Sequence, residues 1–181
     1  MKSESNPPPA APQFRLPPEF TQLIRRHLLF GWGSLLFFLT LGIALEALHG
    51  FKAGMYLGVS KEMRRLMWTL AHAHGTLLAL VHIAFAVTLP HVAAGAAARR
   101  ALASRCLMAA SLLLPGGFFL GGLFLYGDDP GLGIVLVPIG ALLLFASVFL
   151  TIQALRQRKA SEISPGAGGS SDAKPAGKAG R

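Results

Sequence analysis

Three histidines, His72, His74 and His82, lie within the apolar stretch LAHAHGTLLALVHIAFAV, which spans residues 70–87. Imidazole is a good ligand for haem iron, zinc or copper, and it can also hydrogen-bond between helices. Ionisable side chains are costly inside a membrane, usually face other helices and often mark function. Two questions follow: whether this stretch crosses a membrane, and what its histidines contact.

Two further polar side chains, Glu46 and His49, lie near the end of the preceding apolar run. Their Glu-x-x-His spacing puts both on one helix face and suits two ligands of one metal ion. If both runs are spanning helices, Glu46 lies roughly 5 Å below the membrane surface, and His72 and His74 lie roughly 9–12 Å below the same surface. We predict a shared polar layer in which Glu46, His49 and at least one of these two histidines meet. The candidate metal ligands are Glu46, His49 and His74.

The angles around the second helix restrict which histidines can act together. His72 and His74 differ by about 200°, so they cannot both face one centre. His74 and His82 differ by only about 80° and lie some 12 Å apart in depth, so they can line the same side. His82, His27 and His91 then form a looser group toward the opposite surface. The alternative for all of these histidines is that they only hydrogen-bond between helices.

Four apolar runs position these residues, and each is long enough to cross a hydrocarbon core of about 30 Å. The chain is 52% hydrophobic and 14% charged, which is too apolar for a typical soluble domain. Lipid offers no partner for backbone N–H and C=O groups, so each run is expected to be a helix. We predict an all-α integral membrane protein, an up-down-up-down four-helix bundle over residues 17–159. Its spans are expected at about 27–49, 66–89, 106–126 and 132–155, between disordered tails at 1–16 and 160–181.

The net charge of +9 is distributed unevenly between the two sides of the predicted bundle. Four of the 17 Lys and Arg residues, Lys52, Lys61, Arg64 and Arg65, lie on one side, and the remaining 13 lie with the termini on the other. This bias predicts cytoplasmic termini. We expect a multi-pass protein of a bacterial inner membrane. Basic flanks attract anionic lipid headgroups, so the charge does not indicate nucleic acid. The expected partners are the lipid bilayer and other membrane subunits.

The segment AHGTLLALVHIAFAVTLP, residues 73–90, resembles the second helix of haem–copper oxidase subunit I, where a His-Gly-Thr run supplies a haem-ligating histidine. The resemblance implies that His74, followed by Gly75 and Thr76, takes that role. The copper-ligand helices of that family are missing and the chain is too short for the oxidase core, so oxygen reduction is not implied. In size, span count and a histidine early in the second span, the chain also resembles the hydroxylaminobenzene mutase type of membrane protein.

Three functions fit these observations. The first is a non-catalytic accessory or assembly subunit of a membrane complex, whose histidines connect helices. The second is a redox protein that binds haem or a metal through His74, with His49 or His72 as the second ligand. The third is a small proton-coupled transporter, although Glu46 lies near a span end and coupling sites usually lie near the midplane. The single Cys106 does not support a Cys/His zinc site, and no nucleophile–base pair indicates a hydrolase.

Overall fold

The computed structural model describes residues 18–58, 61–92, 94–127 and 129–163, and the regular elements in these ranges are all helical. This confirms the predicted all-α class for this part of the chain. The predicted tail at residues 1–16 and residues 164–181 of the other tail lie outside the described residues. The elements are α1 (Pro18–Gly50), α2 (Gly54–Leu57), α3 (Glu62–Thr88), the 3-10 turns η2 (Leu89–His91) and η3 (Ala94–Ala96), α4 (Ala97–Leu123), the 3-10 turn η4 (Leu132–Val135) and α5 (Leu136–Ile163).

Four helical segments are long and apolar enough to cross a membrane: Pro18–Gly50, Glu62–His91, Ala97–Leu123 and Leu132–Gln157. They contain the first, second and fourth predicted spans completely. The third segment starts nine residues before the predicted span 106–126 and ends at Leu123, after which the backbone of Phe124 is extended. Alanine has the highest helix propensity, so the Ala-rich sequence at the start of α4 extends this helix beyond its apolar run.

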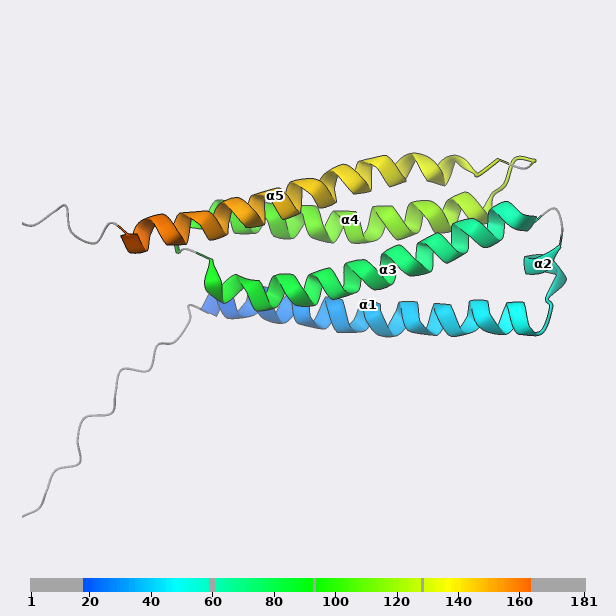
Figure 1. Ribbon diagram of the computed structural model, residues 1–181, viewed down its shortest axis with the longest axis horizontal. Coiled ribbons are helices and arrows are strands. Elements are labelled where there is room, and N and C mark those ends of the chain that lie inside the picture. The colour runs from blue at the N-terminus through cyan, green and yellow to red at the C-terminus, as the bar shows by residue number, and fades with distance from the viewer. Residues whose placement is uncertain (1–17, 59–60, 93, 128, 164–181) are drawn as a thin grey trace, which may run out of the picture.

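Figure 1 shows the four long helices lying along the longest axis, with the chain reversing direction from each helix to the next. Contacts follow the chain order, because α1 packs against α3, α3 against α4, and α4 against α5. In the most apolar 18-residue window of each segment, 39% of the α3 segment and 50% of α4 are buried, against 11% for each flanking helix. The flanking helices α1 and α5 therefore carry most of the exposed apolar surface. Below, the terminal end is where α1 begins and α5 finishes, and the loop end is where α2 lies.

The inner helices meet in a core of apolar side chains, while α4 and α5 approach closely through glycines. A Cβ on Gly117 would lie 2.9 Å from Val137 Cγ2 and 3.0 Å from the carbonyl oxygen of Gly133. Such close approach is typical of helix pairs in membranes, where small residues at the interface let backbones come together. The buried core members are Met67, Ala71, Leu78, Phe85, Leu89, Ala103, Leu107, Leu114 and Phe118.

A tight turn connects α4 to η4 at the loop end. Tyr126 N–H donates to the Asp129 carbonyl at 3.2 Å, and Asp129 N–H donates back to the Tyr126 carbonyl at 3.1 Å. Gly127 has φ +63°, a left-handed conformation that glycine adopts without steric cost. Gly131 N–H donates to the Gly121 carbonyl at 2.9 Å and so holds the two sides of the turn together.

Candidate functional site

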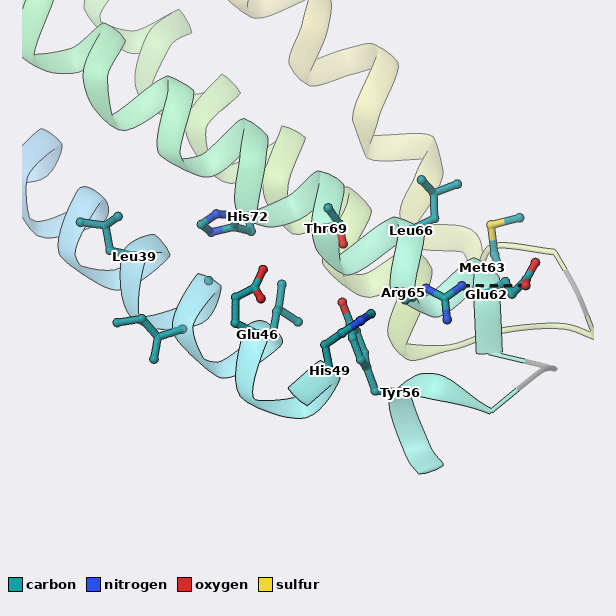
Figure 2. A pocket seen from close by; sticks show the side chains of 13 residues that line it. Leu39, Glu46, His49, Tyr56, Glu62, Met63, Arg65, Leu66, Thr69 and His72 are labelled. Atoms are coloured by element: carbon teal, nitrogen blue, oxygen red, sulfur yellow. Dashed lines mark ion pairs between the residues drawn. The ribbon is translucent and has the colours of Figure 1, made fainter. Parts of the chain in front are cut away.

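A cleft of about 950 Å³ opens between α1 and α3 at the loop end, beside α2. Figure 2 shows the Glu46 carboxylate, the Tyr56 hydroxyl and the Thr69 hydroxyl pointing toward a common space, with the His72 ring beside it and directed toward α1. Apolar side chains of α1 and α3 complete the walls, so the cleft combines a polar group of side chains with apolar surface. The lining residues are Leu39, Gly42, Ile43, Leu45, Glu46, His49, Tyr56, Glu62, Met63, Arg65, Leu66, Thr69 and His72.

The His72 ring is held across the α1–α3 contact. Its Nδ1 lies 2.8 Å from the carbonyl oxygen of Phe38. A carbonyl only accepts, so Nδ1 carries the hydrogen and donates it. In the neutral ring, Nε2 is then an acceptor. Gly42 makes room for this ring, because a Cβ there would lie 2.5 Å from His72 Cε1. These two contacts with α1 fix both the place and the tautomer of this imidazole.

Glu46 and His49 stand on the opposite wall, in the last two turns of α1, and both are exposed. Within the described ranges, the side chain of neither residue forms an ion pair or hydrogen bond. The ion pair on this cleft is Arg65 Nη2 to Glu62 Oε1, at 3.8 Å, with side chains 33% and 77% exposed. Pairs this exposed are worth little, about 0–1 kcal/mol, so they leave the guanidinium available to other partners.

Tyr56 on α2 is buried and belongs to a ladder of aromatic rings. Its ring centroid lies 6.4 Å from that of Trp68, and Trp68 lies 5.7 Å from Phe119 on α4, with near-parallel planes. Arg64 reinforces this end of the molecule, because its Nε donates to the Gly122 carbonyl at 3.1 Å and its Nη1 donates to the Met55 carbonyl at 3.4 Å. The cleft wall formed by α2 is therefore tied to both inner helices.

His74, the remaining predicted site residue, does not line the cleft. Its Nδ1 donates to the Leu70 carbonyl at 2.9 Å, one helical turn back, and its ring lies against Phe118 of α4 with centroids 4.8 Å apart. The structure thus gathers Glu46, His49 and His72 in one cleft and directs His74 toward another helix. Across the described ranges, no group of three His, Cys, Asp or Glu side chains is placed to hold a metal ion. A ligand role for these residues stays a prediction.

A second polar cluster is completely buried toward the terminal end and joins α1, α3 and α4. His27 and His82 are both 0% exposed, and their Nδ1 atoms lie 2.7 Å apart. The outer nitrogens contact serines of α4, with His27 Nε2 to Ser104 Oγ at 2.8 Å and His82 Nε2 to Ser111 Oγ at 2.8 Å. The sequence predicted a looser group of these two histidines with His91. The structure joins the two by a direct contact, whereas His91 is exposed.

The direction of the hydrogen bonds in this cluster follows from its last member. Ser111 Oγ donates to the Leu107 carbonyl at 2.9 Å, so it accepts from His82 Nε2–H. A neutral His82 then accepts at Nδ1 from His27 Nδ1–H, and a neutral His27 accepts at Nε2 from the Ser104 hydroxyl. With both rings neutral, every nitrogen of the pair has a partner of the correct kind. Such full satisfaction is required of polar groups buried away from water.

One signal in the sequence points to this cluster after the fact. Ser104 and Ser111 are seven residues apart, which puts them on the same face of a helix two turns apart. Two serines on one face can hydrogen-bond a buried polar pair on neighbouring helices. Ser111 also lines an apolar groove of about 700 Å³ between α1 and α4.

No protein-family model, curated protein or solved structure matches the chain. What the protein does is therefore inferred from the chemistry and geometry of its cleft and its buried cluster.

Proposed function

We propose that the chain is an integral membrane protein that crosses a bacterial inner membrane four times, with both termini in the cytoplasm. Four segments of sufficient length and apolarity support the crossings. Among the described Lys and Arg residues, eight lie toward the terminal end and four toward the loop end, and this bias supports the orientation. In this arrangement the loop end, with α2 and the cleft, lies at the outer surface of the membrane.

The proposed role is that of a non-catalytic accessory component that holds the polar head of an amphipathic membrane molecule in the cleft. One observation carries it: Glu46, Tyr56, Thr69 and His72 line one cleft beside apolar walls. Sites for small molecules are typically apolar hollows with a few convergent polar groups. At this depth the polar groups face the headgroup region, while Leu39 and Ile43 extend toward the membrane interior. Within the described ranges the His72 ring accepts no hydrogen bond from a hydroxyl or thiol, and the absence of such a nucleophile–base pair favours binding over catalysis.

Filling the cleft tests this role. Thr69 is exposed and lines the cleft, so Thr69→Trp introduces a large ring into it. Thr40 is also exposed, on α1, but lies outside the cleft, so Thr40→Trp is the matched control. Native mass spectrometry of protein purified in mild detergent is expected to show a retained lipid-sized adduct on the wild type and the control. The Thr69→Trp variant should lack it. Equal retention by all three proteins, or no adduct on the wild type, contradicts the proposal.

A second candidate function is haem binding through His72, with His49 as the other ligand. It is favoured by the His72 Nδ1–H bond to the Phe38 carbonyl, because metal-ligating histidines commonly donate their other N–H to such an acceptor. His74 is less suited, since its ring packs against Phe118 and does not line the cleft. The absorption spectrum of the purified protein distinguishes these residues. A Soret band lost in His72→Ala and kept in His74→Ala supports this candidate, and a colourless protein removes it.

A further inference from the structure

We propose that the head bound in the cleft is that of a zwitterionic phospholipid with a primary ammonium group. This inference rests on the proposed function, because it names the ligand class of the same cleft. Its basis is the separation of charge across the cleft. Glu46 lies about one turn before the end of α1, and Arg65 lies about one turn after the start of α3. In Figure 2 the carboxylate and the guanidinium stand on either side of His49 and Tyr56.

The groups around Glu46 match the three hydrogens of an ammonium. The Glu46 carboxylate carries the negative charge and has no ion-pair partner in the described ranges. His72 Nε2 is an acceptor because Nδ1 donates to the Phe38 carbonyl, and the Thr69 hydroxyl oxygen can accept as well. A primary ammonium donates three hydrogen bonds, whereas a quaternary ammonium donates none. The acceptors on this side of the cleft therefore favour the primary amine.

The groups on the other side of the cleft match a phosphate diester. Arg65 offers a planar fork of N–H donors, which suits phosphate oxygens. Its ion pair with Glu62 is long, at 3.8 Å, and the Glu62 side chain is 77% exposed. A phosphate can therefore accept hydrogen bonds from the guanidinium without breaking a buried ion pair. His49 contributes ring N–H near the same rim. The acyl chains follow the apolar walls beside Leu39 and Ile43, toward the middle of α1.

Charge balance separates this ligand from an anionic lipid. A phosphatidylglycerol-type head brings a phosphate but no cation, so it would place its negative charge beside the Glu46 carboxylate without compensation. A phosphatidylcholine-type head brings a cation that cannot donate to Glu46, Thr69 or His72. The cleft therefore binds the three headgroups with different affinities, and phosphatidylethanolamine binds most tightly.

The test uses the full chain, freed of endogenous lipid in detergent and mixed with equal amounts of phosphatidylethanolamine, phosphatidylcholine and phosphatidylglycerol of identical acyl chains. Bound lipid is counted by native mass spectrometry. The wild type is expected to prefer phosphatidylethanolamine about tenfold, as loss of one hydrogen bond to a charged group predicts. Glu46→Gln should abolish that preference and strengthen phosphatidylglycerol binding, because the carboxylate that repels its phosphate is removed. Glu19→Gln, at the exposed far end of α1, is the matched control and should behave as the wild type.

The outcomes separate the two proposals. If the three lipids bind equally, or if Glu46→Gln keeps the preference, the headgroup assignment is wrong. Should Thr69→Trp still remove bound lipid in that case, the cleft remains a lipid site and the proposed function stands. Should the wild type bind none of the three lipids through the cleft, both proposals fail.

Discussion

The Nδ1 atoms of His27 and His82 lie 2.7 Å apart, and at that distance only one of them can carry a hydrogen. The ring centroids are 4.9 Å apart and the planes differ by 24°, so the rings meet edge to edge along a shared N–H···N bond. The two residues are 55 positions apart in the chain and join α1 to α3. Ser104 and Ser111 extend this bond to α4, which makes the cluster the polar connection among three helices.

Removing one ring of this pair should strongly destabilise the protein. His82→Ala leaves a cavity and takes away the partners of His27 Nδ1 and Ser111 Oγ, so we expect a loss of about 2–4 kcal/mol in the free energy of unfolding. His91→Ala is the control, because His91 is exposed and should change stability by less than about 0.5 kcal/mol. Denaturant titration followed by circular dichroism in detergent measures both. Equal stability of the two variants would show that the buried network contributes nothing.

The two rings should hold different tautomers. The hydrogen-bond directions assign the hydrogen to Nδ1 of His27 and to Nε2 of His82. Nitrogen-15 spectra of the imidazoles should show this difference, together with a coupling between the two Nδ1 atoms through the hydrogen bond.

The serine at each end of the chain of hydrogen bonds should have a different effect on these tautomers. Ser111→Ala removes the acceptor for His82 Nε2–H, and a buried N–H without a partner is less tolerated than a bare acceptor. Both rings should therefore reverse, so that His82 donates from Nδ1 and His27 donates from Nε2 to Ser104. Ser104→Ala is expected to leave the tautomers as in the wild type. Identical spectra for the two serine variants would argue against the assigned directions.

Alanine substitution should have opposite effects on stability at two adjacent glycines of α4. A Cβ on Gly117 meets Val137 Cγ2 at 2.9 Å and the backbone of Gly133 at 3.0 Å, so Gly117→Ala is expected to cost about 1–3 kcal/mol. Apart from its chain neighbours and the backbone of its own helix, no described atom lies within 4 Å of the Cβ position at Gly116. Gly116→Ala should therefore stabilise the helix by about 0.5–1 kcal/mol through its higher helix propensity. Melting temperatures of the two variants in the same detergent test the prediction, which fails if Gly117→Ala is as stable as Gly116→Ala.

The proposed orientation in the membrane predicts which positions a membrane-impermeant maleimide reaches. In a Cys106→Ser background, Met55→Cys on α2 should be labelled in intact spheroplasts, because the loop end faces outward. Glu19→Cys, at the terminal end of α1, should be labelled only after the membrane is opened. Both positions are exposed, so a difference reports sidedness and not burial. Labelling of Glu19→Cys in intact spheroplasts would reverse the assigned topology.

The sequence by itself determined the class of the fold and the position of its helices. Four long apolar runs in a chain with few charges have no alternative to helices if they enter lipid, and four segments that could span a membrane are found at those places. Depth along a helix depends only on residue number, so the sequence could also place Glu46, His49 and the early histidines of α3 in one layer. The sequence also showed that only one of His72 and His74 can face the cleft, because their directions around the helix differ by about 200°.

Only the tertiary structure decided which of the two enters the cleft and which partner His27 finds. Helices that are apolar on all sides give no periodic signal of the face that meets a neighbour. That face is chosen by close packing, with Gly42 making room for His72 and Gly31 lying against Ile83 and the Ala79 carbonyl. His27 then meets His82 and Ser104, which are 55 and 77 residues away in the chain. Contacts between such distant residues depend on how helices rotate against one another, which the amino-acid pattern within a single helix does not record.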